Sequence, residues 1–139
     1  MKKRTSIILC LICFSSPAIC FTEKDFTNKK LLCSKLLWGF DFISSNKVQV
    51  IITDLNSNTV VKDYKYDTDL NLSYINIFQN EDDLNNRVYS IELNSLRVDI
   101  WTMTGGGFTT REMFPSGFCK FINNKNLFSL IESLKLSMY

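Results

Sequence analysis

The feature that most constrains the fold is a series of short segments in which apolar and polar side chains alternate. Residues 47–52 and 88–93 are clear examples, and each is bounded by residues that favour turns. Alternation with a period of two places successive side chains on opposite faces of a β-strand. The predicted strands are residues 38–43, 47–52, 60–66, 70–78, 88–93, 96–101, 108–114 and 118–122.

The spacing of these segments predicts how they pair. Short strands that follow one another through turns, with no helical repeat between them, are typical of an antiparallel meander. About eight strands in so short a chain remove their exposed edges most economically by curling. The predicted fold class is therefore all-β and mainly antiparallel, a small meander β-barrel or strongly curled sheet with a C-terminal amphipathic helix.

That helix is predicted at residues 127–138. Its apolar residues recur at helical spacing and Asn126 suits the N-cap. Packing on the barrel is the favoured role. Binding to a membrane surface is the alternative, but Lys135 is the one cation in the segment. Residues 22–37 stay ambiguous, because they suit either one helix face or a first strand.

The beginning of the chain has the layout of a secretory signal peptide. Basic residues 2–4 precede a short apolar stretch at residues 7–14 and a helix-breaking segment at residues 15–18. The apolar stretch is too short to cross a bilayer as a helix, which needs about 20 residues. We expect cleavage after Ala18 or Cys20 to remove residues 1–20. Residues 21–139 would then form a single secreted or periplasmic domain without a membrane anchor.

The charge of that domain argues against nucleic acid as a partner. Three of the 16 Lys and Arg residues lie in the predicted leader, which leaves 13 cations against 14 acids. The net charge is then about −1, and the basic residues are scattered among acidic ones instead of lining a stripe.

Two cysteines remain beyond the predicted leader, Cys33 and Cys119. In an oxidising compartment an even pair is most simply a disulfide. Such a bond would close a loop of 87 residues and contribute about 4 kcal/mol in the chain-entropy model. Two buried thiols or a redox pair are the alternatives, although no CxxC spacing supports redox chemistry.

The chain contains no histidine, which removes the central group of serine and cysteine triads and of many zinc sites. Asp99 and Glu112, on neighbouring predicted strands, are the remaining candidates for an acid and base pair, and Arg97 or Arg111 could tune them or bind an anion. Ion pairing across strands on a solvated face is the favoured interpretation. We predict no catalytic residue, no cofactor and no enzymatic activity.

Two short motifs bear on metal binding and glycosylation. Residues 67–71 open like an EF-hand loop, but Leu72 and Phe78 stand where that loop requires glycine and glutamate. No metal site is predicted. Asn71 begins a glycosylation sequon, which matters only in a eukaryotic source.

Three consecutive glycines, Gly105, Gly106 and Gly107, form the most unusual segment of the predicted domain. Consecutive glycines indicate a tight turn, or a loop that something approaches closely. A plain hairpin turn is favoured. The alternative is the lip of a site for a ligand or partner, with Trp101 and Phe108 beside it.

The layout resembles two families of small exported barrels. A secreted meander barrel with a trailing helix is similar to a shortened lipocalin, but that family places glycine two residues before tryptophan, whereas Trp38-Gly39 reverses the order. One disulfide between the first and last strands is similar to the periplasmic inhibitors of C-type lysozymes. Their inhibitory loop contains Ser-Gly, which is matched here only by Ser116-Gly117. Both resemblances concern layout and assign no family.

Two functions follow from this architecture. The leading hypothesis is that the barrel interior binds a small apolar or amphipathic molecule, because aromatic residues are abundant enough to line a cavity. The alternative is a filled core and a module that binds a protein partner along Trp101, the glycine loop and Phe114-Pro115. The candidate ligand or partner residues are Trp38, Trp101, Gly105, Gly106, Gly107 and Phe108.

Overall fold

The computed structural model describes residues 25–69, 71–79, 85–104, 107–123 and 126–138. Within them the chain forms a nine-stranded antiparallel sheet and one helix, α1 (Leu127–Ser137). The strands are β1 (Lys30–Cys33), β2 (Trp38–Phe42), β3 (Lys47–Thr53), β4 (Thr59–Thr68), β5 (Tyr74–Phe78), β6 (Asn85–Glu92), β7 (Arg97–Thr104), β8 (Gly107–Phe118) and β9 (Lys120–Ile122). The predicted leader and its cleavage site lie outside the described residues.

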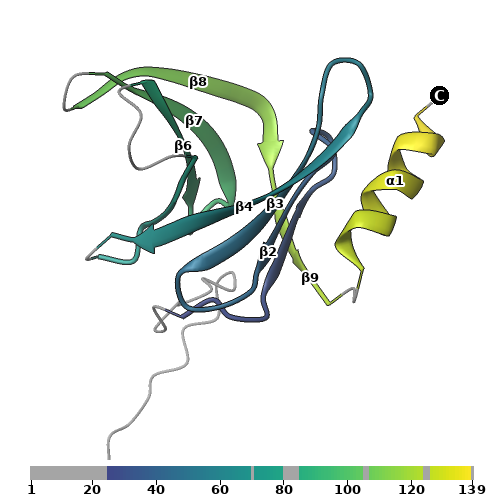
Figure 1. The fold of residues 1–139 in the computed structure, drawn as a ribbon, viewed down its shortest axis with the longest axis horizontal. Helices are drawn as coiled ribbons and strands as arrows, with labels where there is room; N and C mark the ends of the chain where they lie inside the picture. The colour runs from purple at the N-terminus through teal and green to yellow at the C-terminus, as the bar shows by residue number, and fades with distance from the viewer. Residues whose placement is uncertain (1–24, 70, 80–84, 105–106, 124–125, 139) are drawn as a thin grey trace, which may run out of the picture.

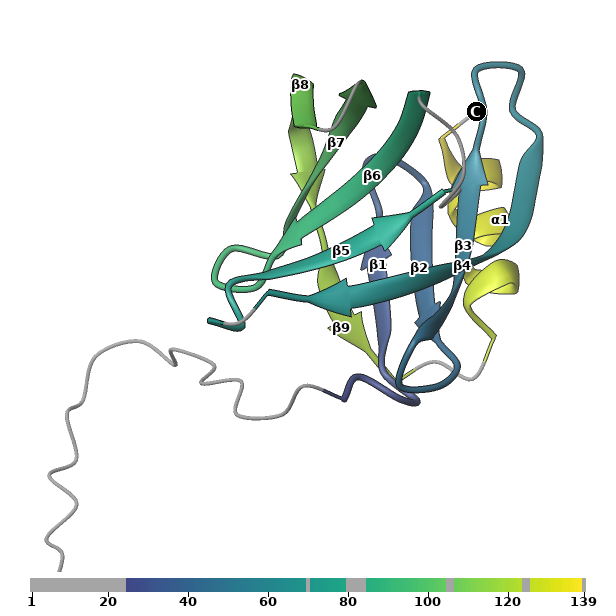
Figure 2. The same cartoon turned by 60° about the vertical axis from the view of Figure 1, so that its left-hand side comes forward.

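The sheet curls strongly into a half-barrel (Figures 1 and 2). Each strand from β1 to β8 pairs with the next along the chain, and β9 returns to pair with β1. The two strands at the ends of the sheet, β8 and β9, are separated in the chain only by Cys119. The last segment therefore bridges β7 and β1. The predicted all-β meander with a C-terminal helix is confirmed, and the ambiguous segment before Trp38 contains a strand.

The last strands differ from the prediction. A turn was expected at residues 115–117, but β8 continues through them. Its register against β7 shifts there, because Asp99 pairs with Met113 whereas Arg97 pairs with Phe118. Proline cannot donate to a ladder, and it is tolerated on an edge strand or at a bulge. Residues 114–117 form such an irregularity in the pairing of β8 with β7.

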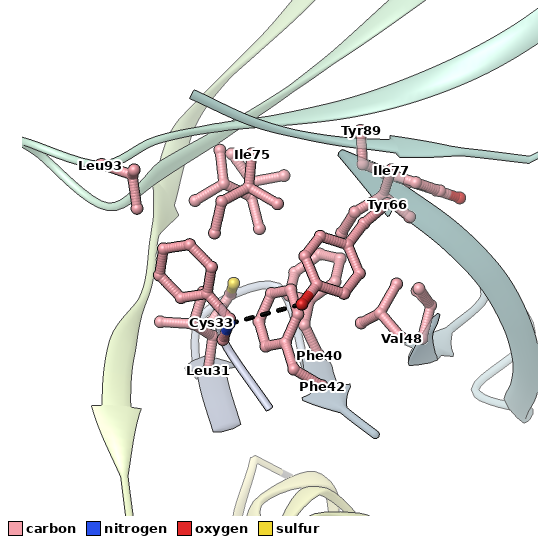
Figure 3. Packing of buried hydrophobic residues seen from close by; sticks show 14 of the residues in the cluster. Leu31, Cys33, Phe40, Phe42, Val48, Tyr66, Ile75, Ile77, Tyr89 and Leu93 are labelled. Atoms are coloured by element: carbon pink, nitrogen blue, oxygen red, sulfur yellow. Dashed lines mark hydrogen bonds between the residues drawn. The ribbon is translucent and has the colours of Figure 1, made fainter. Parts of the chain in front are cut away.

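The inner face of the half-barrel carries the main hydrophobic core (Figure 3). Phe40 and Phe42 from β2 face Ile75 and Ile77 from β5, and all four are fully buried. The ring of Tyr66 also packs in this core, and its hydroxyl donates a hydrogen bond to the Ser44 carbonyl at 2.9 Å. The interior is thus packed with the protein's own side chains.

Helix α1 packs on the opposite, outer face of the sheet, beside β2 (Figure 1). Leu127 and Ile131 are its buried residues, and they approach the sheet closely at Gly39. Asn126 caps the helix by accepting a hydrogen bond from the Ser129 amide at 3.0 Å, as predicted. In the described part of the chain no helix has both the length and the apolar character to span a bilayer.

A disulfide joins Cys33 at the end of β1 to Cys119 between β8 and β9, with the two Cα atoms 4.0 Å apart. The predicted bond is therefore present, and it ties the first strand to the last segment of the sheet. Such a bond fits an extracytoplasmic protein, because reducing compartments keep thiols free.

Candidate functional site

A hollow lined by described residues lies on the outer face of the sheet, over β5, β6 and β7. Asn76, Ser90 and Asp99 occupy consecutive strands in direct register there. They alternate with Ile75, Ile91 and Ile100 of the core, so they face away from it. The cavity has a volume of about 290 Å³. It is lined by Tyr74, Asn76, Ser90, Asp99, Trp101 and Arg111.

A buried carboxylate lies at the centre of this site. Asp99 is only 3% exposed, and its Oδ2 accepts hydrogen bonds from Arg97 Nη2 at 3.2 Å and from Arg111 Nε at 3.1 Å. Arg111 Nη2 also donates to the same oxygen. Within the described residues, Asp99 Oδ1 and Arg97 Nε are buried without a hydrogen-bond partner. The cluster is therefore charged and incompletely satisfied.

Arg111 is held from two directions. Its guanidinium carbon lies 5.3 Å from the centroid of the Trp101 ring, its direct partner in the β7–β8 register. A guanidinium over an aromatic face is attracted by the ring quadrupole. The Asp99 carboxylate fixes the edge of the guanidinium while the ring supports its plane. One third of the Arg111 side chain remains exposed.

Two neutral side chains complete the polar lining. Ser90 Oγ donates to Asn76 Oδ1 at 3.0 Å, which leaves the Asn76 amide nitrogen without a partner among the described residues. Tyr74 begins β5 and is 40% exposed at the cavity. The site thus offers an amide and a phenol beside the guanidinium.

Exposed apolar side chains border the same face. Met113 is 58% exposed and Phe118 is 55% exposed. They pair in register with Asp99 and Arg97 respectively, so they continue the two rows of side chains that cross the site. Exposed apolar and aromatic groups around a polar hollow are typical of a binding surface.

A smaller cavity of about 150 Å³ lies on the inner face. Trp38 packs edge-on against Tyr89 beside it, with ring centroids 6.0 Å apart. Burial raises the pKa of the Tyr89 hydroxyl to about 12. The lining residues are Val50, Ile52, Val60, Lys62, Tyr64, Gln79 and Tyr89. A small cavity therefore remains among these residues on the inner face.

The candidate residues from the sequence are divided between the two faces. Trp101 lines the outer cavity, whereas Trp38 belongs to the inner core. Gly107 and Phe108 begin β8, where their backbones pair with Thr104 and Met103. The side chain of Phe108 lies outside the described residues. Gly105 and Gly106 also lie outside them.

Asp99 and Glu112 do not form an acid and base pair. Glu112 pairs in register with Ile100 of the core, so it lies on the opposite face of the sheet from Asp99. It is 3.9 Å from Arg87 and half exposed. Asp99 does form an ion pair across strands, with Arg111, as the favoured interpretation predicted. The expectation that this pair lies on a solvated face is wrong, because the Asp99 carboxylate is buried.

Sequence reasoning missed Tyr74, Asn76 and Ser90. The sequence does indicate on which face of its strand each of these side chains lies, because each alternates with apolar neighbours. Their meeting in one row depends on the register of β5, β6 and β7, which turn residues alone do not determine.

A metal centre finds no support in the described ranges, where no group of three or more cysteine or carboxylate side chains is close enough to hold an ion. Asp69, from the segment resembling an EF-hand, stabilises a turn instead. Its Oδ1 accepts hydrogen bonds from the amides of Ser73 at 2.6 Å and Tyr74 at 2.7 Å.

Comparison with known proteins adds no relative. No protein-family model, no curated protein and no solved structure matches this chain.

Proposed function

We propose that this chain is a secreted or periplasmic protein without catalytic activity that binds a small amphipathic molecule in the cavity on the outer face of β5 to β7. The observation that carries the proposal is the composition of that cavity. The rings of Tyr74 and Trp101 lie beside Arg111 and Asn76, as in ligand sites that combine apolar walls with a few polar groups.

The location differs from the barrel interior expected from the sequence. Buried aromatic and aliphatic side chains pack the interior, and the cavity described there is about half as large as the outer one. A ligand site of about 300 Å³ or more is usual for small molecules. The outer cavity, at about 290 Å³, is close to that size.

Energetics also favour a binding role for the polar cluster. A buried polar atom without a hydrogen bond costs about 1–3 kcal/mol, and Asp99 Oδ1 and Arg97 Nε are two such atoms in the described part of the chain. Apolar side chains at these positions would stabilise a sheet face better. These atoms are themselves buried, so a cluster that holds Arg111 at the cavity explains the cost more simply than selection for stability does.

A protein partner is the second candidate ligand. Met113 and Phe118 are more than half exposed beside the cavity, and Tyr, Trp and Arg are the residues that most often dominate protein interfaces. In that case the cavity would receive one side chain of the partner.

Two substitutions that fill one cavity each can test the site. Asn76→Trp would occupy the outer cavity, and Gln79→Trp, directly after the same strand, would occupy the inner one. The full chain is purified under non-reducing conditions from the compartment into which it is exported. Native mass spectrometry then measures the adducts that are lost on denaturation.

We expect wild type and Gln79→Trp to carry a small-molecule adduct and Asn76→Trp to lose it. Loss in Gln79→Trp alone would contradict the outer site and return the proposal to the barrel interior. A bare chain in all three proteins, together with no thermal shift in a screen of small amphipathic molecules, would reject small-molecule binding in favour of the protein partner.

A further inference from the structure

We infer that the ligand of the outer cavity carries an anionic group, a carboxylate or a phosphate, and that Arg111 is the residue that binds it. This inference rests on the proposed function and adds the chemical class of the ligand.

A ligand in the cavity meets the charge of Arg111 and not that of Asp99. Arg111 and Asp99 both line it, but the Arg111 side chain is 33% exposed and that of Asp99 only 4%. Asp99 is also paired with a second cation, Arg97. Since the carboxylate is buried and shared by two guanidinium groups, the charge accessible from the cavity is positive.

The geometry of Arg111 suits an anion. Its Nε and Nη2 donate to Asp99 Oδ2, whereas Nη1 makes no hydrogen bond to a described residue. The guanidinium is already held by Asp99 and by the Trp101 ring, so it loses little conformational freedom when an anion binds. A planar guanidinium with free N–H groups suits the oxygens of a carboxylate or phosphate.

The neutral side chains of the cavity also supply hydrogen-bond donors. The amide nitrogen of Asn76 has no partner among the described residues, and the Tyr74 hydroxyl also carries a hydrogen to donate. Glu92 and Asp67 are the acidic neighbours on this face, but neither is among the described lining residues. Donors that line one hollow favour a ligand with several acceptor oxygens.

The remainder of the ligand is apolar and flat. The ring of Trp101 and that of Tyr74 supply the aromatic walls of the cavity, and aromatic surfaces bind flat apolar groups well. Phenylacetate therefore combines the required features in a small probe.

Isothermal titration calorimetry of the full oxidised chain can test this inference with three probes. Phenylacetate and phenylacetamide have nearly the same shape but differ in charge, and phenyl phosphate compares phosphate with carboxylate. The variant is Arg111→Gln. The matched control is Arg87→Gln, because Arg87 is half exposed and pairs with Glu112 on the opposite face.

We expect wild type and Arg87→Gln to bind phenylacetate or phenyl phosphate at least ~10-fold more tightly than phenylacetamide, which is the effect of one charged hydrogen bond. Arg111→Gln should lose this preference and still bind phenylacetamide. Of the two anions, the tighter one identifies the class. Raising the NaCl concentration should weaken binding of the anions only.

Equal affinities for phenylacetate and phenylacetamide in wild type would overturn the anion inference and leave the proposed cavity standing. Failure of all three probes, combined with an adduct that survives in Asn76→Trp, would reject the cavity itself. Arg111→Lys guards against misfolding of Arg111→Gln, since it keeps the charge without the planar fork. Arg111→Lys should keep part of the preference for the anions over phenylacetamide. If it kept the whole preference, the assigned geometry would be contradicted, because lysine lacks the planar guanidinium that Asp99 holds.

Discussion

Arg111 Nε donates a hydrogen bond to Asp99 Oδ2 at 3.1 Å across the β7–β8 pair, and this bond places a cation at the wall of the outer cavity. Asp99 is nearly inaccessible to solvent, so its role is to position arginine side chains. The relationship predicts how substitution of the carboxylate affects stability.

Asp99→Asn should destabilise the protein by about 2 kcal/mol, because hydrogen bonds between charged groups are replaced by weaker ones in a buried place. Urea unfolding followed by circular dichroism measures this change. Glu112→Gln is the matched control. Its carboxylate is half exposed and 3.9 Å from Arg87, so a change within about 0.5 kcal/mol is expected. Equal effects of the two substitutions would show that the Asp99 cluster contributes no more than a surface pair.

The disulfide should contribute strongly to stability. Cys33 and Cys119 are 86 positions apart, and opening a loop of that length costs about 4 kcal/mol in the chain-entropy model. We expect the double substitution Cys33→Ser and Cys119→Ser to lower the free energy of unfolding by about that amount. Wild type measured in a reducing buffer should match the variant. A loss below about 1 kcal/mol would indicate that the unfolded chain is already compact.

Gly39 should not accept a larger side chain. A Cβ atom added there would lie 2.7 Å from Leu127 Cδ2 and 2.8 Å from Ile131 Cδ1, which is closer than van der Waals contact. Gly39→Ala should therefore cost about 1–3 kcal/mol through overpacking. Thermal unfolding of a double-mutant cycle with Leu127→Ala checks the cause. The cost of Gly39→Ala should fall in the Leu127→Ala background, and an unchanged cost would place the effect elsewhere.

Stability should decrease between pH 10 and 12 because of Tyr89. Burial raises the pKa of this tyrosine from 10.0 to about 12 in the folded protein. Above pH 10 the unfolded chain loses the phenolic proton while the folded chain retains it, so unfolding becomes more favourable as the pH rises. Below pH 10 both states are protonated and this contribution to stability is fully present.

Comparison with Tyr89→Phe isolates that effect from the other groups that titrate in alkali. The difference in unfolding free energy between wild type and variant should be constant from pH 7 to 9. From pH 10 upward, the unfolding free energy of wild type should fall relative to that of the variant. Tyr89 makes no hydrogen bond to a residue within the described ranges, so we expect little loss at pH 7. A constant difference across the whole range would contradict the raised pKa.

The sequence by itself determined the local elements. Alternation of apolar side chains predicted most strands, and helical spacing after Asn126 predicted α1, because both patterns depend only on neighbours in the chain. The count of cysteines predicted the disulfide between Cys33 and Cys119. The turn propensity of Pro115 led to a wrong prediction, because a turn was expected where β8 continues. As an edge strand, β8 tolerates proline within its length.

Only the tertiary structure decided where the candidate site lies. Whether Asp99 meets Arg111 and Asn76 lies beside Ser90 depends on strand register, and a shift of one residue would move each side chain to the other face. The burial of Asp99 depends in turn on the curl of the sheet and on arginine side chains from β7 and β8. Pairwise register is a long-range property, and it assembles the cavity from residues that have no motif in the chain.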